Sequence, residues 1–207
     1  MINSVICPKI AESDMAMCAM FAARKQVFVD LLKWDLPVLH DRFEIDQFDT
    51  PDARYLILLG ADGQHRASAR LLPTTGSHIL GDLYPHLCDG DVPRGPRILE
   101  ISRFCLDRNQ DAGSRLSARN QLVTALVDHA INEGINCYTG VAELGWLAQI
   151  LRFGWQCEPL GEPQGNKGSK IGALRIGIDD QTRAKLERTG IYTPLSLQLI
   201  ESRESVA

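Results

Sequence analysis

Apolar residues recur along this chain with two different periods. Where they return every three or four positions, the spacing predicts amphipathic helices. Ser13 and Asp14 offer a start signal for the first of these, and Gly134 ends the longest. The stretches expected to be helical are residues 13–32, 114–133, 143–153 and 180–189.

Shorter apolar runs between turn residues predict strands. The expected strands are residues 54–60, 65–72, 97–106, 136–142, 155–160 and 171–178. Asp62-Gly63 is a hairpin signal, so the first two strands should be antiparallel neighbours. Residues 33–52 have no clean period and many charges. Residues 73–96 are rich in Pro and Gly and are expected to form a long loop, with at most a short helix near 79–86.

This order of elements predicts an α/β fold. A helix, antiparallel strands and a βαβαβ second half imply a mixed, mostly antiparallel sheet with helices on both faces. A chain of 207 residues suits one domain. We therefore expect a single domain over residues 1–207, with the irregular segment 33–52 inside it.

Composition narrows the function classes. Hydrophobic residues make up 44% and charged residues 23%, as in ordinary globular proteins. A formal net charge of −4 gives no reason to expect nucleic-acid binding. No apolar run has the length of a membrane span, and no signal peptide is recognised at the start. A cytoplasmic location without a membrane partner is the expectation.

Cysteine and histidine spacings do not indicate a metal site. The six cysteines contain no CxxC pair, and the five histidines contain no HxxxH or HExxH pair. Several cysteines occupy apolar positions of expected strands and are interpreted as small buried hydrophobes. We expect no metal and no cofactor.

Charged and aromatic residues stand at unusual places in the first half. Arg24 and Phe28 are four apart and share a helix face. Arg70, Glu100 and Arg103 interrupt apolar strands, where charges need partners. The whole set comprises Arg24, Phe28, Trp34, Glu44, Asp46, Asp49, Arg70, Glu100 and Arg103.

Each of these residues also has an ordinary structural interpretation. Trp34 and Phe28 fit a core, and Arg70 fits the solvated side of a hairpin. Glu100 and Arg103 are three apart, so a regular strand places them on opposite faces. A β-bulge would instead turn both toward one cleft, and bulges are common beside active sites. Both alternatives stay open from the residues alone.

Taken together, the set resembles the signature of the acyl-homoserine-lactone synthases, the autoinducer synthases of bacterial quorum sensing. That signature is similar to Arg-x3-Phe-x5-Trp, Glu-x-Asp-x-x-Asp, a strand Arg, and Glu-x-x-Arg. The resemblance spans roughly residues 15–178 and includes Thr139-Gly140-Val141 and Phe153-Gly154-Trp155.

The resemblance implies a GNAT-like α-β-α sandwich with a V-shaped central cleft. It implies that the amine of S-adenosylmethionine attacks an acyl thioester held by acyl carrier protein. The substrate carboxylate then closes a lactone and releases methylthioadenosine. S-adenosylmethionine is a substrate here and not a cofactor.

Site roles follow from the resemblance and from the chemistry. Phe28 and Trp34 would cover the adenine or the sulfonium. Glu100 is the general-base candidate, and a bulge N–H could face the oxyanion. The candidate catalytic set is Glu100, Arg103, Asp46, Asp49 and Arg70, and the candidate S-adenosylmethionine set is Arg24, Phe28, Trp34 and Arg103. Arginines and aspartates of these sets are expected to pair and to hold segment 33–52 as a wall.

The acyl chain is expected to contact Thr139, Leu147, Ile150 and Leu151. In the family a threonine near Thr139 accompanies 3-oxo chains, although a strand position explains it equally well. Docking of the acidic carrier protein is expected at Arg115, Arg119, Arg152, Lys167 and Lys170; a solvated polar face is the alternative.

Two rival functions remain from the sequence. The first is a GNAT-type N-acyltransferase that uses acyl-CoA and a different amine. Such enzymes bind diphosphate on a glycine-rich turn, whereas residues 109–115 here contain one glycine and a carboxylate. The second is a non-catalytic module with the same fold, for which Glu100 would have no purpose.

Overall fold

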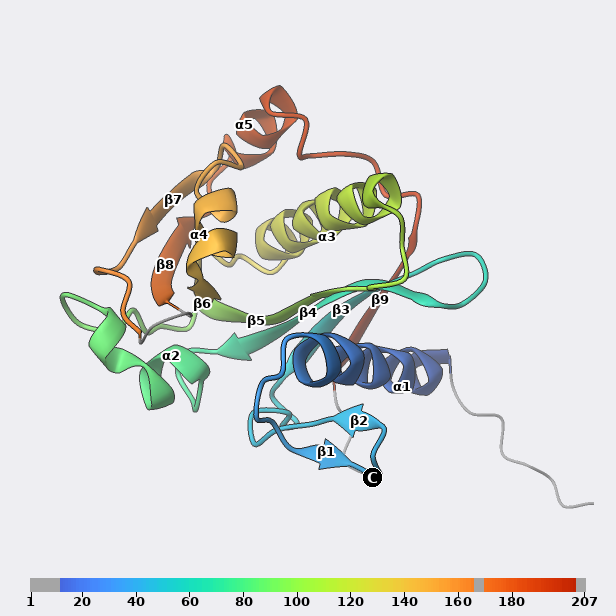
Figure 1. The fold of residues 1–207 in the computed structure, drawn as a ribbon. Helices are drawn as coiled ribbons and strands as arrows, with labels where there is room; N and C mark the ends of the chain where they lie inside the picture. The colour runs from blue at the N-terminus through green and yellow to red at the C-terminus, as the bar shows by residue number, and fades with distance from the viewer. Residues whose placement is uncertain (1–11, 166–169, 204–207) are drawn as a thin grey trace, which may run out of the picture.

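The computed structural model describes residues 12–165 and 170–203, and its main feature is a seven-stranded sheet (Figure 1). The strand order is β7-β8-β6-β5-β4-β3-β9. These strands are β3 (Arg54–Leu59), β4 (His65–Pro73), β5 (Ile98–Leu106), β6 (Cys137–Glu143), β7 (Gln156–Pro159), β8 (Ile171–Gly177) and β9 (Gln198–Arg203). Among them β5 and β6 are parallel, and the other neighbours are antiparallel.

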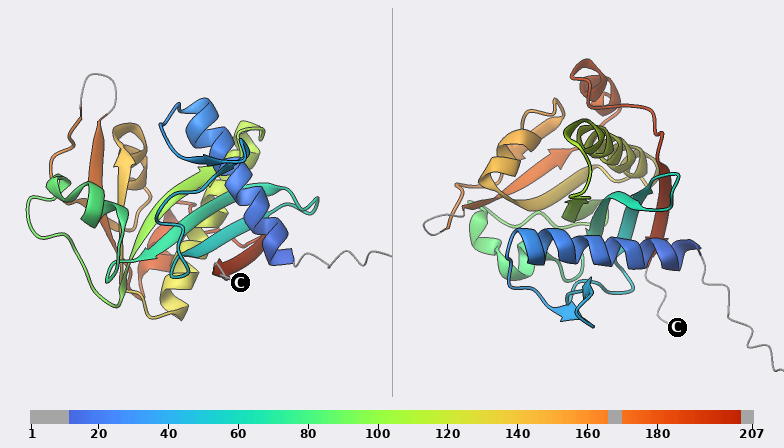
Figure 2. Two further views of the ribbon diagram at one scale, coloured as in Figure 1. Left: turned by 90° about the horizontal axis from the view of Figure 1, so that it is seen from below. Right: turned by 45° about the vertical axis from the view of Figure 1, so that its right-hand side comes forward.

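Helices lie on both faces of the sheet (Figures 1 and 2). They are α1 (Glu12–Arg24), α2 (Ile79–Leu83), α3 (Ala112–Asn132), α4 (Leu144–Ile150) and α5 (Thr182–Arg188). A π-helical turn (Lys25–Leu31) extends α1, a 3₁₀ turn (Pro85–Leu87) follows α2, and β1 (Val38–Leu39) pairs with β2 (Phe43–Glu44) in a small hairpin. The predicted mixed, mostly antiparallel α/β architecture is confirmed.

Alternation along β3 supplies two cores at once. Leu56 and Leu58 pack into the core beneath α3, while Tyr55 and Ile57 pack into the core beneath α1. Successive strand residues point to opposite faces, so both sides of a sheet covered by helices must be apolar. A charged side chain within this part of the sheet, such as that of the fully buried Arg70 on β4, is therefore kept from water.

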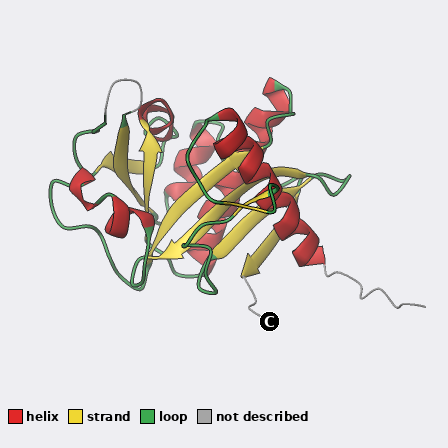
Figure 3. Ribbon diagram, turned by 60° about the horizontal axis from the view of Figure 1, so that its bottom comes forward, coloured by secondary structure: helices red, strands yellow, loops and turns green. Residues whose placement is uncertain are grey.

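The sheet opens between β5 and β6. Their pairing runs only through Ile98–Ile101 and Cys137–Gly140, although β5 continues to Leu106 and β6 to Glu143. The two groups of strands run in different directions from this point (Figure 3). At the last paired position the backbones lie close together, since an added Cβ on Gly140 would lie 3.1 Å from the Ile101 carbonyl oxygen. The divergence produces the expected V.

A β-bulge stands at Arg103. Arg70 is paired with Ser102 and Ser68 with Cys105, so two residues of β5 oppose one of β4. Arg103 adopts a left-handed backbone conformation with φ of 49°, which costs energy for a residue other than glycine. The bulge alternative for this strand is confirmed.

The C-terminal segment was missed by sequence reasoning. Residues 190–197 cross α3, whose Gln121 side-chain oxygen accepts hydrogen bonds from the backbone N–H groups of Ser196 (2.7 Å) and Leu197 (2.9 Å). The chain then enters β9 at the sheet edge beside β3.

Within the described residues, no helix is long and apolar enough to cross a membrane.

Candidate active site

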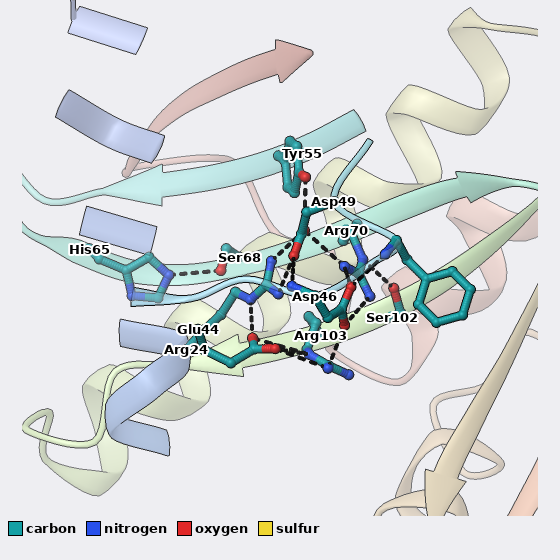
Figure 4. A network of polar contacts seen from close by, with 11 residues as sticks. Arg24, Glu44, Asp46, Asp49, Tyr55, His65, Ser68, Arg70, Ser102 and Arg103 are labelled. Carbon is teal, nitrogen blue, oxygen red and sulfur yellow. Dashed lines mark hydrogen bonds and ion pairs between the residues drawn. The ribbon is translucent and has the colours of Figure 1, made fainter. Parts of the chain in front are cut away.

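Six charged side chains form a closed ring of alternating sign beneath α1 (Figure 4). They come from α1, from the segment after the π-helical turn, and from β4 and β5. In order around the ring they are Arg24, Glu44, Arg103, Asp46, Arg70 and Asp49, and the last returns to the first. The expected pairing of these arginines with carboxylates is therefore present.

Two of the arginines are completely buried in this ring. Arg24 Nε donates to Glu44 Oε2 (2.6 Å), and both of its terminal nitrogens donate to Asp49 at 2.8 Å. Arg70 Nη1 donates to Asp46 Oδ1 (2.6 Å) and lies 2.8 Å from Asp49 Oδ1. Planar guanidinium groups suit such forked contacts, which a lysine could not reproduce.

The third arginine closes the ring from the bulge. Arg103 Nη2 lies 3.0 Å from Glu44 Oε1 and 2.6 Å from Asp46 Oδ2. Its guanidinium also lies 5.5 Å from the centre of the Phe28 ring. The left-handed conformation at Arg103 thus turns its side chain toward the carboxylates.

Mutual neutralisation makes this burial tolerable. Burial by itself would raise the pKa of Asp49, but the guanidinium groups of Arg24 and Arg70 hold that pKa well below its usual range. The same balance lowers the pKa of Asp46, where Arg70 is the main opposing partner. Three positive and three negative charges cancel, so the ring is neutral as a unit. Burying these six charges costs desolvation free energy. Removing any one of them is strongly destabilising, because its partners are then left buried without an opposite charge.

The ring fixes the segment 33–52 against the sheet. Carboxylates of the ring also accept backbone N–H groups of their own loop, from Asp46 to Asp49 Oδ2 and from Phe48 to Asp46 Oδ1, both at 2.8 Å. The Tyr55 hydroxyl on β3 donates to Asp49 Oδ1 (2.9 Å). This loop therefore takes its shape from charges supplied by elements distant in sequence.

Phe28 and Trp34 are brought together by the π-helical turn. The backbone N–H of Trp34 donates to the backbone carbonyl of Phe28 (2.9 Å). The two aromatic rings stack with centroids 5.0 Å apart and an interplanar angle of 21°. Single π-helical turns are frequent at functional sites because they redirect side chains. Here the turn presents two aromatic rings to a cleft.

Glu100 lies outside the ring and is fully buried. Its two carboxylate oxygens accept the backbone N–H groups of Ile79 (2.8 Å) and Leu80 (2.6 Å) at the start of α2. Burial raises the pKa of Glu100 to about 7, although these two hydrogen bonds oppose the rise. A carboxylate with such a pKa can accept and release a proton near neutral pH.

The V opens into a cleft of about 1410 Å³. Its polar part is lined by Phe28, Trp34, Asp46, Glu100, Ser102 and Arg103, and its apolar part by Val123, Trp146, Ile150, Phe153, Trp155 and Leu174. The other four ring members, Arg24 among them, are absent from this lining. The structure therefore places Arg24, predicted to contact the ligand, behind the wall.

The predicted acyl-chain residues separate into two groups. Thr139 and Ile150 line the cleft. Leu147 instead packs in the core against Gly172, and Leu151 is exposed. Helix α4 contains only seven residues, so its apolar pattern could not fix which side faces the cleft. Trp146, which sequence reasoning had not selected, occupies that side.

Thr139 carries a buried hydroxyl that has no hydrogen-bond partner among the described residues. It is fully buried and lies opposite Glu100 in the β5–β6 register. Orphaned buried polar atoms are rare, and this hydroxyl is free to bond a water or a ligand group in the cleft.

The residues predicted to dock the carrier protein differ from one another in their surroundings. The Arg115 guanidinium donates to two carbonyls of the loop before α3, and the Arg119 guanidinium lies 5.0 Å from the centre of an aromatic ring. Arg152 and Lys170 are exposed, and Lys167 lies outside the described residues. Across residues 12–165 and 170–203, no group of three His, Cys, Asp or Glu residues is placed to hold a metal ion.

Comparison with known proteins points to one family. The model of a family described as autoinducer synthase matches residues 9–186. An acyl-homoserine-lactone synthase of Aliivibrio fischeri is 33% identical over 167 residues, which cover 77% of this chain and 85% of that protein.

Solved structures agree with this assignment. BjaI, a CoA-dependent acyl-homoserine lactone synthase solved with SAM and isopentyl-CoA, superimposes with a TM-score of 0.76 at 26% identity, covering 87% of each chain. A putative N-acetyltransferase from Lactobacillus plantarum shares the fold, with a TM-score of 0.52, 17% identity, and coverage of 78% of this chain and 90% of that one.

The ring predicts a specific stability loss. Asp49→Asn should lower the free energy of unfolding by about 3–5 kcal/mol, because it leaves Arg24 and Arg70 without their shared carboxylate. The matched control is Glu158→Gln, which breaks an exposed ion pair with Arg175 and should cost at most about 1 kcal/mol. Urea unfolding of both variants measures the difference. Equal losses would contradict the role of the ring.

Proposed function

Since the chain belongs to the autoinducer synthase family and is an acyl-homoserine-lactone synthase, we propose that it acylates S-adenosylmethionine with an acyl group delivered by acyl carrier protein. The amine attacks the thioester carbonyl, and the amide forms as the carrier thiol leaves. The carboxylate of the same molecule then displaces methylthioadenosine from its γ-carbon and closes the lactone. Both substrates are metabolites of the cell interior, so the cytoplasm is the proposed location.

The single observation that carries this mechanism is the placement of Glu100. Its carboxylate is buried, belongs to the lining of the same cleft as Phe28 and Trp34, and is not a member of the ring. Because ring charges neutralise one another, Glu100 is the carboxylate assigned to take the proton from the substrate ammonium. Breaking its two hydrogen bonds to α2 is unnecessary, since each oxygen keeps a second lone pair for the substrate.

The remaining site residues divide into contact and positioning roles. Phe28 and Trp34 are assigned to the adenosyl sulfonium end of the substrate, where an aromatic face attracts a cation. Arg103 and Asp46 are assigned to the amino-acid end, because both line the cleft. For Arg24, Asp49 and Arg70 we propose a positioning role in place of direct contact.

The choice of carrier protein over coenzyme A rests on the start of α3. Asp111 caps this helix, and its two oxygens accept the Ser114 N–H (3.0 Å) and hydroxyl (2.6 Å). A helix start binds phosphate through free N–H groups, and a carboxylate there repels a diphosphate. Exposed Arg152 and Lys170, with Arg115, Arg119 and Lys167, remain the proposed contacts for an acidic carrier.

The acyl donor is identified by comparing the two thioesters directly. Purified protein is incubated with S-adenosylmethionine and the same acyl group on either acyl carrier protein or coenzyme A, and lactone is identified by mass spectrometry. We expect kcat/KM to be at least about tenfold higher for the carrier, and this preference to fall on Arg152→Glu because an electrostatic contact is reversed. A higher value for coenzyme A would overturn the donor assignment, and absence of lactone from both would overturn the function.

Glu100→Gln should lower kcat by about 10²–10⁴-fold, because it removes the base. In the unaltered protein, kcat/KM should rise as pH increases through about 7, where Glu100 ionises. This rising limb of the pH–rate profile should be missing from the residual activity of the variant.

Ile79→Pro is a companion variant. It removes one N–H donor to Glu100 at the first position of α2, and the extended backbone of His78 accepts a following proline. Since that bond lowers the pKa of Glu100, its loss should move the limb to higher pH. An unmoved limb in both variants would exclude Glu100 as the base.

We propose that Thr139 donates its hydroxyl proton to a 3-oxo group of the acyl chain. Thr139→Val should therefore lower the kcat/KM ratio of 3-oxo to unsubstituted thioesters about five- to tenfold, as expected for one hydrogen bond. Thermal unfolding should be unchanged, because the hydroxyl has no protein partner to lose. An unaltered ratio would assign Thr139 to strand packing alone.

A further inference from the structure

An aromatic contact spans the open end of the V. Phe104 lies on β5 beyond the bulge, and Trp146 lies on α4, which follows β6. Their ring centroids are 5.2 Å apart, and both residues line the cleft. The two diverging arms of the sheet are therefore joined again by these two side chains.

This contact is the front of a continuous aromatic wall. Trp146 meets Phe153 edge-on at 5.8 Å, and Phe153 meets Trp155 at 5.7 Å. The Trp155 indole N–H donates to the Ile150 carbonyl (3.0 Å), which fixes its orientation. From the other side, the Arg119 guanidinium covers the Phe153 ring. Each ring is thus held by a neighbour or by a hydrogen bond.

The spacing leaves no passage through the wall. Aromatic rings with centroids 4.5–7 Å apart are in direct contact, so an alkyl chain cannot thread between them. Overpacking an apolar pocket is also costly, because cores do not yield continuously. A chain that enters the apolar part of the cleft must end at this wall or turn away from it.

Trp146 differs in burial from Phe153 and Trp155, although all three line the cleft. It is only partly buried, whereas Phe153 and Trp155 belong to the buried core. It also belongs to a short helix that follows directly on β6, so its position is tied to the arm that carries Thr139. Replacing it removes the indole that contacts Phe104 and leaves the buried Phe153 and Trp155 in place.

Resting on the proposed function, we propose that Trp146, backed by Phe104 and Phe153, sets the length limit of the acyl group. The wall selects short or compact acyl thioesters and excludes long linear ones. Because a methylene that does not fit lowers the rate about 10–200-fold, one indole is enough to define a sharp cutoff.

The test compares Trp146→Ala with Leu151→Ala on a series of saturated acyl thioesters of increasing length. Leu151 lies directly after α4 but is exposed and outside the cleft lining, so it is the matched control. Wild type and the control should lose activity at the same chain length. Trp146→Ala should raise the long-to-short ratio of kcat/KM by about tenfold or more, and Trp146→Phe should give an intermediate ratio while keeping the aromatic contact.

Two results would overturn the inference. One is a wild-type preference for long linear chains. The other is a long-to-short ratio in Trp146→Phe and Trp146→Ala that equals the control. Wild-type lactone formation in the same assay separates these outcomes from a failure of the proposed function, which would give no lactone from any thioester.

Discussion

The structure depends on a ring of six buried charges that satisfy one another. Removing an isolated ion from water costs several kcal/mol, and a carboxylate or guanidinium in this position is tolerated only with close partners. Each member has a neighbour of opposite sign on both sides, and the sum of charges is zero. The ring draws α1, the loop around Asp46 and the strands β4 and β5 to one point. Together with the buried Phe48, whose side chain packs in the core beneath α1, the ring holds the irregular segment 33–52 on the sheet.

This arrangement separates scaffold from chemistry. The ring uses its own charges internally and presents only Asp46 and Arg103 to the cleft. Glu100 is held apart by backbone N–H groups of α2, and burial raises its pKa against the opposing effects of those N–H groups and of Arg70. The bulge at Arg103 serves both parts, because it turns that side chain into the ring while β5 and β6 diverge beside it. The positions of Asp46 and Arg103 in the cleft thus depend on ion pairs with ring members that do not line the cleft.

Sequence patterns predicted most strands along the chain, the hairpin at Asp62-Gly63 and the bulge alternative, because period and turn chemistry are local. They could not show that Arg24 is a ring member that does not line the cleft, since its partners are 20 and 25 residues away. Strand β9 was missed because polar residues interrupt its apolar positions and its place is set by contacts to α3 and β3. Leu147 and Leu151 were expected at the acyl chain but do not line the cleft, since a helix of two turns leaves the phase of its apolar pattern undetermined. The residue in their place, Trp146, had the appearance of an ordinary core aromatic.

The central claim is that the ring is scaffold and that Glu100 receives the substrate amine. A crystal structure with S-adenosylmethionine bound tests it most directly. The account predicts the amine within hydrogen-bonding distance of Glu100, the sulfonium beside Phe28 and Trp34, and all six ring contacts intact. A substrate ammonium or carboxylate that replaces one of the ring partners, with Glu100 out of reach, would contradict it.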